Sequence, residues 1–505
     1  MNNYNFFFFF CLLMPFRAHA ELNWTSFQKT PAESPVSSMQ LAVNQNSKAL
    51  LAWFQPLDQQ ICTAYYDCVM KKWDATLKIP ATTSSITLLA VSYMENQKGG
   101  LLWLDVQNNR LYVSHLNQNT WSKPLPLQIP FPVGNVQSIF DSEGNLTVVW
   151  TSWNGLEQVI QGVFYSETSH NWTSITDLSP IGFKCETPKI TLNSKGKGAI
   201  VWQAIITSGL GSATQSFVQM ATFDLHAFQW FEPIPFGYDW VNTVLTCPDI
   251  VMDDSENIAV AWEAIPPNQE EKRIQYVLFS AKQNEWSYIY EMELGTSRPQ
   301  WDRNAQNIEL LWVNRDGLNM AQCDAENHLM GQVHNLAPSC HKVSHLKIAY
   351  DTLGKCNLLW LCEGTLHAIH YNHEWIAPLY FNQKPLQAFD FSQDALGNVV
   401  LAVLQEGQML YAVGDYLLPP TVFEGEKIEV RYPSRKATYA NLSWNFANSP
   451  NSVAYILRRD GALLTILPAH ACQYTDYRCP NGHTKYELSV LNVDKIESFS
   501  IKRSL

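Results

Sequence analysis

Residues 139–172, IFDSEGNLTVVWTSWNGLEQVIQGVFYSETSHNW, are the unit from which most of this chain is built. The unit reads as three strands, because a short apolar segment is followed by the alternating run Leu146–Trp150 and then by Gln158–Tyr165. Asp, Ser, Glu, Gly and Asn at positions 141–145 separate the first two strands, and tight turns prefer these residues. Variants of the unit recur to near residue 415, which predicts a repeat fold.

Tryptophan marks the period of the repeat. The second strand of each unit ends in Trp at positions 53, 103, 150, 202, 262, 312 and 360, with Val403 in the eighth place. The seven intervals between neighbouring positions of this series cover 350 residues, so the average length of a repeat is 50 residues. A second Trp follows the third strand at positions 24, 73, 121, 172, 230, 286 and 375. An antiparallel sheet of about four short strands repeated at this length is a propeller blade. Parallel βαβ units would need amphipathic helices between the strands, and the sequence has none, so we predict an all-β propeller over residues 21–418.

The two ends of the repeat region are complementary. Glu21–Trp24 has the Trp that ends a unit without the strands before it, whereas Phe389–Val413 has the inner strands without that Trp. We therefore predict that the N-terminal strand completes the last blade and closes the ring, which removes an open sheet edge. The predicted number of blades is eight. Seven is the alternative, because the unit Arg298–Met330 is irregular at its outer strand.

The pattern changes after Tyr416. Residues 421–505 contain short alternating runs, with Trp444 on the second and Tyr486 on the sixth. This part resembles a fibronectin type III domain, in which a Trp and a Tyr at these two places pack together. The resemblance implies a small β-sandwich, and in an exported protein it implies a spacer or adhesive module.

Residues 1–20 resemble a secretory signal peptide. An apolar run, Phe6–Phe16, precedes Ala18-His19-Ala20, where small residues flank a cleavage point before Glu21. The run is too short for a membrane-spanning helix, which needs about 20 apolar residues. We therefore expect a secreted or periplasmic protein whose mature chain has no membrane span.

Ten cysteines remain after that segment is removed, as an exported protein allows. The candidate disulfides are Cys472 with Cys479, and Cys185 with Cys247 across neighbouring repeats. Cys356 and Cys362 lie six residues apart on one expected strand, too far to bridge each other. No spacing is typical of a zinc site, so we expect neither a metal nor a cofactor.

Charge and motifs exclude several functions. A net charge of −12 with 16% charged residues argues against nucleic-acid binding, which needs clustered Lys and Arg. The repeats resemble the bacterial propellers that include sialidases and lectins, in architecture only. Sialidase chemistry needs several arginines to clamp a carboxylate, and residues 21–418 contain Arg110, Arg273, Arg298, Arg303 and Arg315 alone. The sequence also lacks a Gly-x-Ser-x-Gly elbow and a His-Glu-x-x-His motif, so we expect that the protein is not an enzyme.

Three Trp residues of the repeat region lie off both repeat positions: Trp153, Trp240 and Trp301. Their places in the loops predict that all three lie on one face of the propeller, where long loops also gather. We expect a ligand groove there, with these Trp as stacking platforms. The expected polar contacts are Asp239, Asp249, Glu263 and Arg298.

The sequence thus predicts an exported, non-enzymatic binding or adhesion protein that recognises a glycan or a protein ligand on one propeller face. One alternative is a glycan-active hydrolase or lyase with carboxylates at the propeller mouth, among them Glu186, Asp249 and Glu263. Another is a scaffold in an envelope assembly, with a flat aromatic face against a protein partner.

Overall fold

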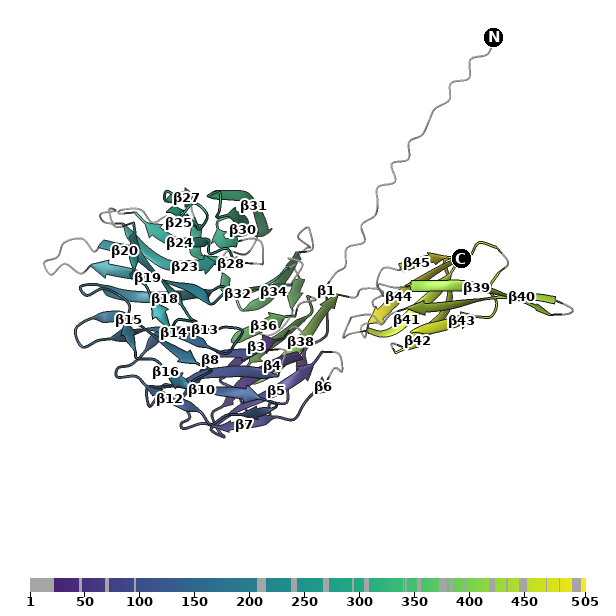
Figure 1. Cartoon of the computed structure of the whole chain (residues 1–505), viewed down its shortest axis with the longest axis horizontal. Coiled ribbons are helices and arrows are strands. Elements are labelled where there is room, and N and C mark those ends of the chain that lie inside the picture. The colour runs from purple at the N-terminus through teal and green to yellow at the C-terminus, as the bar shows by residue number, and fades with distance from the viewer. Residues whose placement is uncertain are drawn as a thin grey trace, which may run out of the picture. The chain divides into compact units, whose positions relative to one another are not determined.

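The computed structural model describes residues 22–505 apart from short segments (Figure 1). These segments are 45–47, 69–71, 95–96, 207–214, 238–242, 267–271, 293–294, 304–307, 339, 341–342, 352–355, 372–378, 382–384, 395–396, 417–422, 433–434, 445–451, 469, 481 and 493–500. The secondary structure of the described residues consists of β-strands without a helix, which confirms the all-β prediction. Residues 24–415 form one compact unit, and residues 416–505 belong to another.

Described strands between residues 22 and 416 form eight antiparallel sheets of four or five strands, which we number I to VIII. Sheet I consists of β3 (Ser38–Val43), β4 (Lys48–Gln55), β5 (Gln60–Asp67), β6 (Lys72–Trp73) and β7 (Leu77–Pro80), and sheet II of β8 (Ile86–Tyr93), β9 (Lys98–Asp105), β10 (Arg110–Asn117), β11 (Thr120–Trp121) and β12 (Leu125–Gln128). Sheet III consists of β13 (Gly134–Phe140), β14 (Leu146–Trp153), β15 (Gln158–Ser166), β16 (Asn171–Trp172) and β17 (Thr176–Asp177). Sheet IV consists of β18 (Lys184–Leu192), β19 (Lys197–Ile206), β20 (Gln215–Asp224), β21 (Gln229–Trp230) and β22 (Ile234–Phe236).

Sheets V to VII continue in the same order along the chain. Sheet V consists of β23 (Val244–Met252), β24 (Ile258–Ile265), β25 (Arg273–Ser280), β26 (Glu285–Trp286) and β27 (Tyr290–Met292). Sheet VI consists of β28 (Gly295–Arg303), β29 (Ile308–Asn314), β30 (Gly317–Asp324) and β31 (Leu329–Ala337). Sheet VII consists of β32 (Val343–Tyr350), β33 (Cys356–Cys362), β34 (Thr365–Tyr371) and β35 (Leu379–Phe381). Sheet VIII joins both ends of this unit: β36 (Ala388–Gln393), β37 (Val399–Gln405) and β38 (Gln408–Tyr416) pair with β1 (Leu22–Trp24) and β2 (Gln28–Lys29).

Local chemistry explains the turn between the first two strands of sheets III and V. The Asp141 carboxylate accepts hydrogen bonds from the amides of Glu143 and Asn145, both at 2.8 Å, and from the Asn145 side chain at 2.8 Å. Asp253 makes the same set of bonds with Ser255 and Asn257. An Asp that bonds its own backbone two residues on stabilises a turn without help from the rest of the fold.

The Trp that ends each second strand is a core residue. Trp150, Trp202 and Trp262 are fully buried. In each case the indole N–H donates to the side-chain oxygen of a Gln directly opposite on the third strand: Gln161, Gln219 and Gln275, at 3.2, 2.9 and 2.9 Å. A buried indole favours such a partner, so sheets III to V carry both the large side chain and its acceptor.

Neighbouring sheets pack face to face. One apolar core fills the space between sheets III and IV, another lies between IV and V, and a third lies between V and VI. Four-stranded antiparallel sheets repeated in this way are the blades of a β-propeller. The chain is therefore a repeat β-propeller followed by a second, smaller unit.

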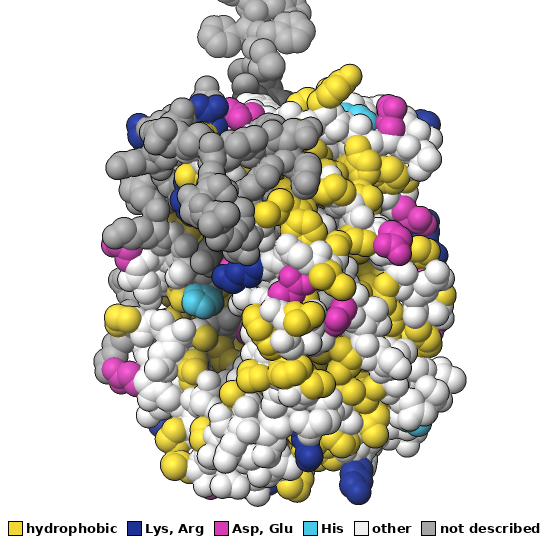
Figure 2. All heavy atoms as spheres, turned by 90° about the vertical axis from the view of Figure 1, so that its left-hand side faces the viewer, with side chains coloured by type: hydrophobic (Ala, Val, Ile, Leu, Met, Phe, Trp, Pro, Cys, Tyr) yellow, Lys and Arg dark blue, Asp and Glu magenta, His cyan; other side chains and the backbone are white. Residues whose placement is uncertain are grey.

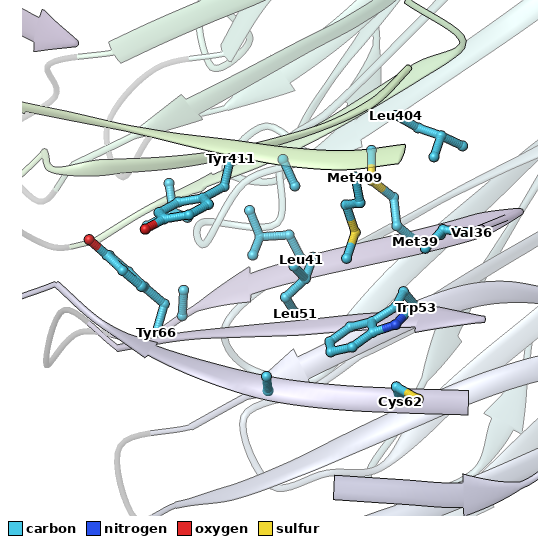
Figure 3. Packing of buried hydrophobic residues seen from close by; sticks show 14 of the residues in the cluster. Val36, Met39, Leu41, Leu51, Trp53, Cys62, Tyr66, Leu404, Met409 and Tyr411 are labelled. Carbon is cyan, nitrogen blue, oxygen red and sulfur yellow. The ribbon is translucent and has the colours of Figure 1, made fainter. Parts of the chain in front are cut away.

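Sheets VIII and I, which lie at opposite ends of this unit in sequence, also share a core (Figure 3). Leu404, Met409 and Tyr411 face Met39, Leu41 and Trp53 there. The Leu41 amide donates to the Asp390 carboxylate at 2.8 Å. Outside this core, the Thr25 amide of the N-terminal segment donates to the Val413 carbonyl at 2.9 Å.

The second unit consists of two antiparallel sheets. One has the order β39 (Phe423–Tyr432), β40 (Arg435–Trp444), β43 (Gln473–Asp476); the other has the order β42 (Ala462–Pro468), β41 (Ser452–Arg459), β44 (Lys485–Asn492), β45 (Ile501–Ser504). Trp444 and Tyr486 are both buried in its core, where the Trp444 ring lies 5.6 Å from that of Tyr455.

The disulfide predictions were wrong. Cys185, Cys247, Cys472 and Cys479 are free thiols, whereas Cys340 and Cys362 form a disulfide. Cys185 packs in the core between sheets III and IV, while Cys247 lines a cavity at the start of β23, so the two thiols lie in different environments. Cys479 is buried in the core of the second unit, and Cys472 is exposed.

Candidate functional site

The first strands of sheets III to VII are all bulged near their starts. In four of them a residue within the bulge has a φ between 47° and 52°: Asn135, Thr187, Cys247 and His345. A bulge adds one residue to a strand, bends it and re-aims its side chains. The five strands therefore redirect their side chains at corresponding places.

A cavity of about 810 Å³ lies where these bulges meet. Its polar lining residues are Asn135, Gln137, Thr187, Lys189, Cys247, Asp249, Gln300, Ser344 and His345. They come from five successive sheets, and most carry amide, hydroxyl or charged groups that can bond a polar ligand.

The space-filling view in Figure 2 shows patches of hydrophobic side chains on one face of the chain, with charged side chains scattered between them.

Asp249 is the predicted site residue that lies in this cavity. Its side chain comes from β23, and its Oδ2 accepts a hydrogen bond from the Trp301 amide of β28 at 2.6 Å. Burial raises the pKa of Asp249 to about 6, although nearby Lys189 acts in the opposite direction. Desolvation disfavours the charged form of a carboxyl, so this group is poised to gain from a hydrogen-bond donor on a ligand.

The prediction for Trp301 was wrong. This residue is only 5% exposed and packs between sheets V and VI, with its ring 6.5 Å from that of Tyr276. The reason is the bulge between Ser297 and Gln300, after which Trp301 faces the neighbouring sheet. Its indole is a core group and cannot be a stacking platform.

Trp153 ends β14 and is 47% exposed, as a surface contact requires. It is not among the described residues that line the cavity. Trp240 and Asp239 lie outside the described residues, as does Trp375.

Glu263 and Arg298 do not contribute a described side chain to the cavity. Glu263 is 1% exposed and forms an ion pair with Lys272 at 2.8 Å. Because Glu263 is buried and paired with Lys272, its carboxylate belongs to the interior of the sheet. The expected place of Glu263 in the ligand groove is therefore corrected. Arg298 lies in the bulge of β28, and its side chain is outside the described part of the structure.

Most of the polar residues of the cavity were missed in the sequence, although a signal for them exists. Glu186-Thr-Pro-Lys189, Thr246-Cys-Pro-Asp249 and Ser297-Arg-Pro-Gln300 share a polar residue on each side of an x-Pro pair. Proline lacks the N–H that a ladder would use, so it marks strand ends and bulges. Reading this pattern across units would have located the bulges and the side chain that follows each of them.

Asp302, two residues beyond Gln300 on β28, is a second carboxyl group with an unusual pKa. Burial raises its pKa to about 8, and the nearby Asp249 and Glu309 carboxylates add to the rise. Glu309 is itself buried, and burial raises its pKa too, even though it accepts a hydrogen bond from the Tyr350 hydroxyl at 2.5 Å. We therefore expect the stability of the propeller to depend on pH.

Replacing Asp302 by Asn is expected to stabilise the protein above neutral pH. The folded state holds the Asp302 proton more tightly than the unfolded state, so the stability that this group contributes is present at acid pH and is lost as the pH rises toward 8. Asn stays neutral and can still accept the Arg303 amide hydrogen bond, which measures 2.7 Å in the wild type. We expect D302N to gain on the order of 2 kcal/mol at pH 8.5 and nothing at pH 4, as measured by urea unfolding. An equal effect at both pH values would contradict this account.

Asp141, Glu143 and His226 are the one set of described residues whose ligand atoms lie close enough, within 4.8 Å, to hold a metal ion. The two Asp141 oxygens already accept hydrogen bonds within their own turn. The set is therefore explained by turn formation and gives no reason to assign a metal.

No protein-family model and no curated protein matches this chain. The solved structure of the polysaccharide lyase Uly1 is similar over 77% of this chain and 91% of that one, with 10% identity and a TM-score of 0.46. The Dos1 propeller is similar over 77% and 94%, with 10% identity and a TM-score of 0.44. The WD40 domain of Toxoplasma gondii coronin is similar over 78% and 86%, with 10% identity and a TM-score of 0.40.

Proposed function

We propose that this chain is an exported, non-enzymatic binding or adhesion protein that takes a glycan or another polar ligand in the propeller cavity. The observation that carries the proposal is the convergence of polar side chains from five successive sheets on a space of about 810 Å³. Small-ligand sites typically measure about 300–1,000 Å³. The amides of Asn135, Gln137 and Gln300 both donate and accept hydrogen bonds, as the hydroxyls of a sugar do.

We also propose that sheets I to VIII form one closed ring of eight blades. The pairing of β1 and β2 with β38 supports this closure, as does the hydrogen bond between Leu41 of sheet I and Asp390 of sheet VIII. A closed ring would hold the five bulged strands at fixed distances from one another, and preorganisation of this kind favours binding.

The remaining parts of the chain support export and adhesion. Residues 1–20 have the composition of a signal peptide, and the Cys340–Cys362 disulfide is typical of an oxidising compartment, as in secreted or periplasmic proteins. For residues 421–505 we propose a fibronectin type III-like module of the kind found in bacterial secreted proteins. Its support is the pair of three- and four-stranded sheets around Trp444 and Tyr486.

A glycan-active enzyme is the less favoured reading. Hydrolysis of a glycosidic bond ordinarily needs two carboxyl groups on either side of it. Asp249 is the single carboxylate among the described residues that line the cavity. Glu186 and Glu263 form ion pairs with Lys184 and Lys272.

An assembly scaffold is a second candidate, and one surface feature favours it. Leu156 and Ile181 are 80% and 81% exposed on two neighbouring loops. Glu157 holds the loops together, because its carboxylate accepts the Gly182 amide hydrogen bond at 2.8 Å. Exposed apolar side chains on ordered loops suit a protein partner.

A glycan array with the chain from residue 21 onward tests the proposal. Gln137→Leu removes hydrogen-bonding capacity from the cavity, so we expect it to weaken binding of the selected glycan about tenfold. The matched surface variant Leu156→Ser should leave that affinity unchanged. Loss of binding in L156S with retention in Q137L would overturn the cavity site and favour the scaffold.

A further inference from the structure

One position of the repeat carries a recurring order of side chains. It is the residue of the first strand that pairs with the residue just before the Trp position on the second strand. In sheets IV, V and VI this residue is Lys189, Asp249 and Gln300, and in sheets VII, VIII and I it is Lys347, Asp390 and Gln40. The propeller therefore contains the series Lys, Asp, Gln twice.

The two Asp residues bond the next sheet in the same way. Asp249 accepts the Trp301 amide hydrogen bond at 2.6 Å, and Asp390 accepts that of Leu41 at 2.8 Å. Trp301 follows Gln300, just as Leu41 follows Gln40.

The two Gln residues also correspond. Gln300 donates to the Leu346 carbonyl and Gln40 to the Leu88 carbonyl, both at 3.4 Å. These bonds link successive sheets, so the Asp and Gln of both series have a structural role.

The two Lys residues differ. Lys347 forms an ion pair with Asp390 at 2.6 Å, which compensates a carboxylate that is almost fully buried. Lys189 is exposed and lines the cavity. Among the described residues, Lys189 forms no ion pair or hydrogen bond with Asp249. Asp249 is nearly as buried as Asp390 but lacks the lysine partner that its counterpart has.

We propose that Lys189 and Asp249 together bind an anionic carbohydrate, with the ammonium group of Lys189 on the acid group of the sugar and the Asp249 carboxylate on a neighbouring hydroxyl. This inference rests on the cavity being the ligand site. A buried carboxylate without a cationic partner is costly, and a ligand hydroxyl supplies a further donor beside the Trp301 amide. A charge-assisted bond to the lysine adds selectivity for acidic over neutral sugars.

The matched lysines provide the test. Isothermal titration of the chain from residue 21 with oligogalacturonate should show binding, and the neutral galactose oligomer of equal length and linkage should bind more weakly. Lys189→Met should weaken oligogalacturonate binding about 10- to 100-fold, without changing binding of the neutral oligomer or the unfolding temperature. Lys347→Met should do the reverse: it should retain the affinity and lower the unfolding temperature by about 5 °C, because Asp390 loses its partner.

A sulfated galactose oligomer shows whether the site requires a carboxylate or accepts any anionic group. If K189M loses affinity for the sulfated oligomer as much as for oligogalacturonate, the site binds both carboxylated and sulfated sugars. Equal binding of oligogalacturonate by K189M and the wild type would overturn the inference. If Q137L still lost binding in that case, the cavity would remain the ligand site. If the wild type bound neither the acidic nor the neutral oligomers, both this inference and a glycan ligand would fail.

Discussion

Replacing Trp262 by Ala is expected to lower the free energy of unfolding by about 3–5 kcal/mol. Trp262 is fully buried in the core between sheets IV and V, where the protein cannot fill the space that an indole leaves. The change also removes the donor to the Gln275 side chain, at 2.9 Å, and leaves a buried amide oxygen without it. Urea unfolding followed by fluorescence measures the loss.

Trp153→Ala is the matched control for Trp262→Ala. Trp153 lies on the strand three residues beyond the Trp position of its own sheet, but it is 47% exposed. Its replacement should change the free energy of unfolding by less than about 0.5 kcal/mol. Similar losses in the two variants would show that the repeat Trp residues are not the basis of the packing between sheets.

Deleting residues 21–30 is expected to cost on the order of 5 kcal/mol and to cause association of the protein. The deletion removes β1 and β2 from sheet VIII, including the bond from the Thr25 amide to Val413. It also removes the Trp24 ring, which lies 5.3 Å from Phe381 of sheet VII. The edge of β38 would then be open to pair with another chain.

Size-exclusion chromatography and thermal unfolding would measure both consequences of the deletion. Lys29→Ala is the control, because Lys29 is exposed on β2 and its backbone pairing with β38 does not depend on its side chain. That variant should behave as the wild type. A truncated chain that stays monomeric and unfolds at the wild-type temperature would argue against closure by the N-terminal segment.

Sequence patterns predicted the strands and turns well because their causes are local. The expected runs Leu146–Trp150 and Gln158–Tyr165 lie within β14 and β15. Alternation of apolar residues and a self-bonding Asp act over a few neighbouring positions. The buried Trp residues were recognisable for a similar reason, since each repeat must fill the same space against its neighbour.

Predictions about the site were less accurate because they depended on where single side chains point. Trp301 was expected at the cavity mouth, but one bulge in β28 places it in the core. A bulge shifts every later residue of a strand relative to its partner, and hydrophobic alternation does not reveal it. Asp249 lines the cavity, and its role as a ligand contact stays a prediction. Lys189 was overlooked because a single exposed lysine has no distinctive pattern.

The sequence alone determined the all-β class, the repeat of about 50 residues and the change of pattern after Tyr416. Only the tertiary structure decided which distant residues meet: Asp249 with Trp301, Cys340 with Cys362, and the polar groups of five sheets in one cavity. The physical reason is that strand and turn preferences arise from interactions between near neighbours. Contacts across the propeller depend instead on the summed effect of bulges and sheet packing over the whole chain.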